Sequence, residues 1–212
     1  MYIPTAFRVE ALAELHAFMR EYSFATLITA GDEPFITHLP LLLDPAAGPY
    51  GTLIGHFARP NAHWQMDHAR LPSIAVFHGP HAYISPTWYR SGSPAVPTWN
   101  YAAVHATGKL SLLTDAADAA AVLQRTVDAY ESARPSPWQN KLPAEMNEKL
   151  VASIVAFRMP IERIEGKFKL GQNRAAVDQI GAIEALESAG DADSAVLAKF
   201  TRKHLGHVRP RE

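Results

Sequence analysis

Residues 73–78 (SIAVFH) and 81–85 (HAYIS) decide how this sequence is expected to fold. Both are short runs rich in β-branched and aromatic residues, and the Gly79-Pro80 pair between them is typical of a turn. Similar runs, punctuated by Gly, Pro, Asp and Asn, lie outward from them at residues 24–29 (FATLIT), 36–43 (ITHLPLLL), 51–57 (GTLIGHF) and 99–113. Six short strands at this spacing predict an antiparallel β-barrel.

Helical patterns precede and follow these strands. Apolar residues recur at helical spacing within residues 9–22, and the sequence becomes Ala-rich near Asp115 until Pro135 and Pro137 end that pattern. Pro143 suits the first residue of a following helix. The remaining expected elements are a strand at residues 155–164 and helices at residues 174–188 and 193–204. We therefore expect a mainly β chain with α additions, an α+β fold.

The domain prediction follows from length and composition. The 212 residues are 48% apolar and include no cysteine, so a sizeable core needs no disulfide, and thiol nucleophiles and cysteine-ligated metals are excluded. We expect one domain over residues 1–212, with helical additions at residues 115–154 and 174–212. No signal-like segment follows Met1 and no apolar run approaches the roughly 20 residues of a membrane span. The expected location is cytoplasmic, with no membrane contact.

Charge is unevenly distributed along the chain. The formal net charge is −1, yet residues 199–212 hold five Lys or Arg and one acid. Such basic ends are more often solvated than bound to phosphates, and no helix-turn-helix is identified. The charge pattern therefore does not support DNA binding, although DNA stays open as a partner.

Residues 71–104 contain a single charged residue, Arg90, among many polar aromatic rings. Residues 56–105 also hold three of the four tryptophans and six of the ten histidines. Because each buried N–H or O–H group needs a partner, an ordinary core does not require so many. A flat aromatic ligand with hydrogen-bonding edges would use them, so this stretch predicts a binding site.

Several polar side chains near this stretch suit a phosphate group. Arg59 and Asn61 flank a proline and so project from a rigid turn. Lysines 167 and 169 share a face if their segment is extended. These cations, with Thr98 and Asn100 as neutral donors, predict charge-assisted hydrogen bonds to phosphate. The alternative is ordinary turn bonding by Thr and Asn and solvated Arg and Lys.

Four phrases carry a resemblance to a known family: residues 55–64 (GHFARPNAHW), 77–89 (FHGPHAYISPTWY), 96–101 (VPTWNY) and 166–174 (GKFKLGQNR). In this order and spacing, and with a Tyr-Ile-Pro opening at residues 2–4, they resemble the PaiB family of FMN-binding split-barrel proteins. The resemblance implies a split β-barrel with Greek-key antiparallel strands and flanking helices, and a homodimer that holds FMN at the subunit interface. It also implies a negative transcriptional regulator or flavin-dependent sensor. One departure is Gly171, where the family usually has serine.

The resemblance gives the candidate residues specific roles. At least one of Trp88 and Trp99 is expected to contact the isoalloxazine ring, the alternative being barrel core with satisfied indole N–H groups. Gln172 and Asn173 are expected at the pyrimidine edge of the flavin, although Asn173 could equally cap a helix that begins at residue 174. The phosphate and ribityl chain are assigned to Arg59, Asn61, Thr98, Asn100 and Lys169.

An enzyme is the rival hypothesis. Flavin reductases and pyridoxamine phosphate oxidases use the same barrel, so an FMN-dependent oxidoreductase is the alternative function. The sequence assigns no catalytic residue, since only His78, His81 and His105 offer an acid or base.

Metal binding is weakly indicated. His78 and His81 form a His-x-x-His pair, but no cysteine or motif glutamate accompanies them and Gly79-Pro80 is expected to turn between them. No metal is predicted, and the expected roles of these histidines are core packing or hydrogen bonding. Haem held by a histidine is a third alternative.

Overall fold

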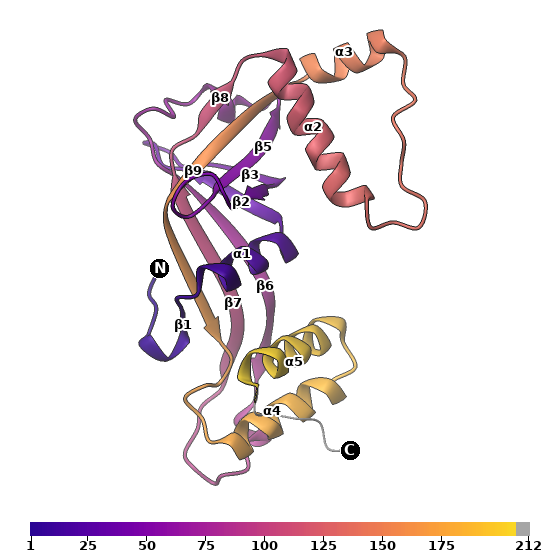
Figure 1. The fold of residues 1–212 in the computed structure, drawn as a ribbon. Coiled ribbons are helices and arrows are strands. Elements are labelled where there is room, and N and C mark those ends of the chain that lie inside the picture. The colour runs from indigo at the N-terminus through magenta and orange to yellow at the C-terminus, as the bar shows by residue number, and fades with distance from the viewer. Residues whose placement is uncertain (207–212) are drawn as a thin grey trace. The chain divides into compact units, whose positions relative to one another are not determined.

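The computed structural model describes residues 1–206, which divide into two compact units. The barrel unit is Leu12–Phe77 with His105–Ile164. The strand-end unit is Met1–Ala11 and His78–Val104 with residues 165–206. Figure 1 shows three long strands, β6 (Ser73–Ile84), β7 (Thr98–Gly108) and β9 (Ile154–Lys169). Each of them contributes residues to both units.

The barrel unit contains a curled antiparallel sheet. Strand order is β3-β2-β6-β7-β9-β5-β4, and β1 and β8 both pair with β9. β3 contacts β5 although the two are far apart in this order, because the sheet curls onto itself. The predicted antiparallel barrel is confirmed. The other strands of this unit are β2 (Phe24–Thr29), β3 (Phe35–Pro40), β4 (Leu42–Asp44), β5 (Thr52–Ala58) and β8 (Ser111–Leu113).

Three α-helices and one short 3-10 helix complete the barrel unit. They are α1 (Leu12–Glu21), α2 (Ala116–Glu131), α3 (Ala144–Ala152) and η2 (Ala62–Gln65). α2 begins where the composition changes, since the Asp115 carboxylate accepts a hydrogen bond from the Ala117 N–H at 2.8 Å. Pro143 lies one residue before α3 and is its N-cap. Helices were expected at the places of α1, α2 and α3, whereas η2 was not predicted.

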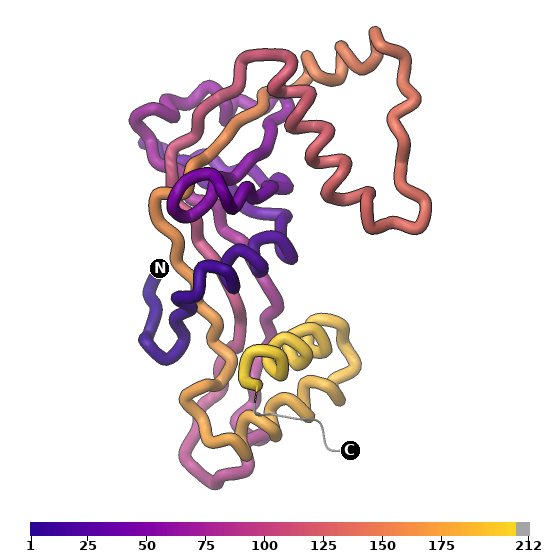
Figure 2. The backbone as a smooth tube through the Cα atoms, in the orientation of Figure 1, coloured from indigo at the N-terminus to yellow at the C-terminus, as the bar shows by residue number. Residues whose placement is uncertain are grey.

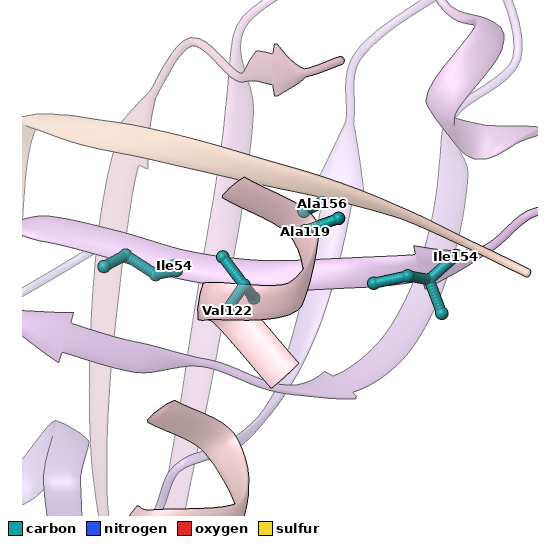
Figure 3. Packing of buried hydrophobic residues seen from close by; sticks show 5 residues of the cluster. All are labelled: Ile54, Ala119, Val122, Ile154 and Ala156. Carbon is teal, nitrogen blue, oxygen red and sulfur yellow. The ribbon is translucent and has the colours of Figure 1, made fainter. Parts of the chain in front are cut away.

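The core of the barrel unit joins sheet and helix. Ala119 and Val122 of α2 pack against Ile54 of β5 and against Ile154 and Ala156 of β9, as Figure 3 shows. Elsewhere Phe57 and Phe157, both buried, stack with ring centroids 4.6 Å apart. Ile154 and Ala156 thus face α2 while Phe157 packs against Phe57, so both faces of the first residues of β9 are buried.

The strand-end unit has its own helices and a short strand. α4 (Ala176–Ser188) and α5 (Ala192–Leu205) lie side by side, drawn in yellow in Figure 2. Phe168 of β9 packs against Phe200 and His204 of α5. The other elements are η1 (Thr5–Phe7), β1 (Arg8–Val9) and η3 (Pro86–Trp88). The basic residues Arg209 and Arg211 of the predicted tail lie outside the described residues.

The two runs at residues 73–85 form one strand, so the predicted turn between them is wrong. β6 runs without a break through Gly79 and Pro80. Residues before the pair are buried at odd positions and residues after it at even positions, so the alternation changes phase there. In the sequence, such a break in the apolar alternation looks the same as the end of one strand and the start of another. It also falls at the boundary between the two units.

Other strand boundaries also differ from expectation. Residues 36–43 divide into β3 and β4 on either side of Leu41, because β3 pairs with β2 while β4 pairs with β5. Residues 99–113 divide into β7 and β8. β9 is longer than expected, since its last residues pair with β1, with Arg8 opposite Lys167. In residues 1–206 no helix combines the length and apolarity needed to cross a membrane.

Candidate functional site

Lys169 lies at the centre of the candidate site in the strand-end unit. Its Nζ donates hydrogen bonds to Thr98 Oγ1 at 2.6 Å and to the Trp99 carbonyl at 2.5 Å, which joins the end of β9 to the start of β7. The segment is extended through residue 169, which is the condition under which Lys167 and Lys169 were expected to share a face. Three of the predicted site residues are thus in direct contact.

Two further cations surround this lysine. Burial lowers the pKa of Lys169, and the charges of Lys167 and Arg174 lower it further. No carboxylate lies within ion-pair distance of Lys169 in the described part of the chain. Lys167 is buried, donates to the Tyr2 carbonyl at 3.1 Å and lies 5.1 Å from the centre of the Tyr101 ring. An anion would relieve the repulsion among these cations.

Aromatic rings form an exposed surface on the same unit. Trp99 is 55% exposed, so the core alternative for this side chain is wrong. Its ring lies 6.2 Å from that of His81 and 6.3 Å from that of Tyr83, the latter edge-on at 76°. Tyr83 is itself 45% exposed. Large exposed rings of this kind mark a ligand or protein contact.

Asn100 and Gly171 are close neighbours. Asn100 is buried, and its side-chain nitrogen lies 3.9 Å from where a Cβ on Gly171 would be. Gly171 has φ +85°, a left-handed conformation that costs other residues free energy. A Cβ at this position would crowd no neighbour, so the left-handed backbone conformation is what favours glycine over the family's serine.

Gln172 and Asn173 lie in the turn that follows β9. Gln172 Oε1 accepts a hydrogen bond from the Leu170 N–H at 2.7 Å, and its Nε2 donates to the Phe168 carbonyl. Asn173 is exposed. The alternative of Asn173 as a helix cap is wrong, because α4 begins later, at Ala176, with Ala175 as N-cap and no side-chain cap bond.

Arg59 and Asn61 belong to the barrel unit and have partners within it. Arg59 Nε donates to the Ala152 carbonyl at 2.5 Å and its Nη2 to the Ile154 carbonyl at 2.8 Å, so it satisfies one carbonyl at the end of α3 and one at the start of β9. Asn61 caps η2 by accepting from the His63 N–H at 3.0 Å. Trp88, half-buried, ends η3 in the strand-end unit.

His63 is the centre of a buried polar network in the barrel unit. It is 0% exposed, and its Nδ1 and Nε2 lie 2.8 Å and 2.7 Å from the hydroxyls of Thr37 and Thr29. Asn61 donates to Thr37, so Thr37 can donate to Nδ1 and Nε2–H to Thr29, which describes a neutral ring. Burial, together with the smaller effect of the nearby His68, lowers the pKa of His63 to about 4. The network is therefore built for the uncharged histidine.

Sequence reasoning missed other residues of the strand-end unit. The Arg174 guanidinium lies 4.7 Å from the centre of the Tyr89 ring and adds the third cation of the cluster. Asp178 and Gln179 are buried polar residues of α4. A polar pair inside an otherwise apolar helical pattern was the available signal. Among residues 1–206 no group of three or more His, Asp or Glu is placed to hold a metal ion.

The curled antiparallel half-barrel with flanking helices defines this chain as a split-barrel protein. Residues 1–163 match the family model described as "Putative FMN-binding domain". The chain belongs to that family, whose description names the cofactor that was expected, FMN. Lys169, Gln172 and Asn173 lie beyond the matched residues.

Curated and solved proteins agree with this assignment. The chain is 36% identical over 208 residues to the Protease synthase and sporulation protein PAI 2 of Bacillus subtilis (strain 168), covering 97% of this chain and 98% of that protein. This confirms the resemblance to the PaiB family.

Two solved structures show the same fold. The FAD and heme binding protein of Mycobacterium smegmatis has a TM-score of 0.58 at 14% identity, covering 87% of this chain and 80% of that one. The flavocytochrome Anf3 of Azotobacter vinelandii has a TM-score of 0.56 at 14% identity, covering 76% and 69%. The predicted split barrel is confirmed.

Proposed function

We propose that this chain is a homodimeric, FMN-binding regulator of the PaiB type, acting as a negative transcriptional regulator or flavin-dependent sensor. The observation that carries the proposal is that Lys167 and Arg174 place positive charge around the hydrogen-bonded Lys169. The exposed Trp99 lies beside this lysine. A flavin phosphate is a dianion attached to a flat aromatic ring. It complements both features.

The roles of the side chains follow from their surroundings. Lys169 would hold the phosphate, with Thr98 as a neutral donor, and the other two cations would strengthen the local positive potential. A bound dianion would raise the pKa of Lys169 from its lowered value, which couples binding to the charged form of the lysine. Trp99 would lie against the ring. Bound FMN supplies redox chemistry that amino-acid side chains lack.

The homodimer is proposed from the exposed apolar surface of the strand-end unit. Val96 is 70% exposed and lies shortly before Trp99 in sequence, and the exposed Trp99 ring lies 6.3 Å from that of Tyr83 on the neighbouring strand β6. A second copy that covers this surface would remove it from water. Val96→Asp should weaken dimerisation in sedimentation equilibrium, whereas Val196→Asp on α5, also exposed, should leave it unchanged. Equal dissociation constants for the two variants would contradict this interface.

The regulatory role is taken from the resemblance to the PaiB family, to which the Bacillus subtilis relative named for protease synthesis and sporulation points, and surface charge does not support it. In α5 the basic Arg202 is paired with Glu187 at 2.7 Å. A regulator of this kind would act through a flavin- or dimer-dependent contact. Retardation of promoter DNA at moderate salt would support direct binding, and none at low salt would contradict it. Steady NAD(P)H oxidation with FMN would favour the oxidoreductase alternative.

Titration with two flavins tests the phosphate site. Quenching of flavin fluorescence should show FMN binding, and Lys169→Ala should weaken it by about 10-fold to 100-fold, the range for a lost charged hydrogen bond. Riboflavin lacks the phosphate, so its affinity should be nearly unchanged by the substitution. Lys109→Ala, an exposed lysine in the barrel unit, is the matched control. Absence of FMN binding, or equal losses for both flavins, would contradict the assignment.

A further inference from the structure

A buried carboxylate holds the segment that follows Trp88. Asp178 of α4 is 2% exposed, and its Oδ1 accepts hydrogen bonds from the backbone N–H groups of Arg90 and Ser91, both at 2.7 Å. Its Oδ2 accepts from the Ser91 hydroxyl, also at 2.7 Å. Burial opposes ionisation, but these donors outweigh it and hold the pKa of Asp178 below its usual value. The carboxylate is thus a fixed, charged anchor for a loop.

Close packing along α4 reinforces this anchor. A Cβ on Gly181 would lie 2.2 Å from the Trp88 carbonyl oxygen, so the helix approaches η3 at a distance that only glycine permits. The Arg90 side chain also pairs with Glu184 at 2.5 Å, on the exposed side of the same helix. The backbone at residues 88–91 therefore follows the surface of α4.

The next residue of the helix holds a second loop. Gln179 is buried, and its Nε2 donates to the Gly171 carbonyl at 3.1 Å and to the Arg174 carbonyl at 2.9 Å. These two carbonyls bracket the turn that contains Gln172 and Asn173. Adjacent helix positions point about 100° apart, since an α-helix has 3.6 residues per turn. Asp178 and Gln179 can therefore reach different loops from one turn.

We propose that Asp178 and Gln179 are positioning residues for the flavin ring. Asp178 fixes the segment that follows Trp88, and Gln179 fixes the turn that contains Gln172 and Asn173. This inference rests on the proposed flavin binding. Residues 89–97 contain no regular secondary structure, so without an anchor they would lose conformational entropy when a ligand binds. An anchor made in the free protein removes that cost from binding.

Substitution of the carboxylate tests the first anchor. Asp178→Ala should raise the dissociation constants of FMN and riboflavin together, by about tenfold, because the anchor acts on the ring-binding loop and not on the phosphate site. Asp178→Asn keeps an oxygen that can accept from both backbone N–H groups, so it should stay within about threefold of the unmodified protein. This recovery by the asparagine distinguishes positioning from a requirement for charge.

Matched measurements separate positioning from general stability. Glu184→Gln removes only the exposed ion pair to the Arg90 side chain, which contributes little free energy, and leaves the hydrogen bonds to Asp178 in place, so both dissociation constants should be unchanged. In Asp178→Ala the amides of Arg90 and Ser91 should exchange faster with solvent while amides of the barrel unit keep their protection. Gln179→Ala should likewise weaken both flavins and speed exchange in residues 171–174.

The outcomes distinguish this inference from the proposed function. Unmodified protein that binds neither flavin would overturn both. If the unmodified protein binds FMN but Asp178→Ala binds both flavins with unchanged affinity, the positioning role alone is overturned. Unchanged amide exchange at residues 90–91, or losses in Asp178→Asn equal to those in Asp178→Ala, would overturn it as well.

Discussion

The two units use similar cations in opposite ways. Arg59, in the barrel unit, donates hydrogen bonds from its guanidinium to the carbonyls of Ala152 and Ile154. Lys169, in the strand-end unit, lies among other cations and beside no carboxylate in the described chain. Both were candidates for the same phosphate. The partners around a basic side chain therefore indicate better than its place in a motif whether it is available to bind an anion.

A similar contrast holds for the buried polar groups. In the barrel unit His63 has hydroxyl partners on both ring nitrogens and is uncharged. In the strand-end unit Asp178 is charged and holds backbone N–H groups of a loop. The first arrangement maintains a core, whereas the second orders a segment without regular structure. Four substitutions test this division, beginning with the one expected to have the largest effect.

Removal of a core ring should affect the barrel unit most. Phe157→Ala should lower the free energy of unfolding by about 3–5 kcal/mol, because a buried ring stacked on Phe57 leaves a cavity. Urea denaturation followed by circular dichroism measures this loss. Phe157→Leu should cost clearly less and keeps the test usable if the alanine variant does not fold. A loss below about 1 kcal/mol for Phe157→Ala would show that this stack is not central to stability.

Acid should destabilise the barrel unit through His63. Its pKa is about 4 in the folded protein and near 6.5 in an unfolded chain, so the unfolded state binds more protons between these values. The stabilisation is complete above pH 6.5 and is lost as pH falls towards 4, by about 3 kcal/mol.

Denaturation at several pH values checks the histidine. His63→Gln should make the decline between pH 6.5 and 4 shallower, and His38→Gln, at an exposed position, should leave it unchanged. His68, also buried with its pKa lowered by burial, adds a decline of the same sign that remains in the first variant. An equally steep decline in His63→Gln would assign the acid sensitivity elsewhere.

Substitution of Arg59 tests whether it differs from Lys169 in its role. Arg59→Ala should lower the free energy of unfolding by about 1–2 kcal/mol, since two carbonyls near the end of α3 lose their donor. The dissociation constant for FMN should not change, in contrast to Lys169→Ala. A loss of FMN affinity in Arg59→Ala like that in Lys169→Ala would return Arg59 to the phosphate site.

The smallest effect is expected at Gly171. Gly171→Ser and Gly171→Ala should each cost about 1 kcal/mol in stability, because a Cβ is disfavoured at φ +85°. Since both variants carry the same backbone cost, a difference in their FMN affinity reports the hydroxyl alone. Thermal unfolding and flavin titration measure the two quantities. Equal stability of both variants with the unmodified protein would show that the turn relaxes.

Local patterns predicted most elements of the fold. The barrel strands, α2 beginning after Asp115 and the two C-terminal helices follow from periodicity, caps and glycine placement, which act over a few residues. The continuity of β6 through Gly79-Pro80 was not predictable in this way. Gly and Pro usually end strands, and here pairing with neighbouring strands keeps the segment extended.

For the candidate site, residue types were readable in the sequence and partners were not. Motifs identified Lys169, Thr98 and Trp99. The extended form of residues 165–169 was only a condition of the lysine argument, since the strand was expected to end at residue 164. Whether a guanidinium finds a carbonyl acceptor depends on which segment packs beside it, and that segment can lie about 90 residues away in sequence, as Ala152 does from Arg59. The anchor from Asp178 to Arg90 spans a similar separation. Hydrogen-bond partners at such distances are set by packing of the whole chain, which no local pattern encodes.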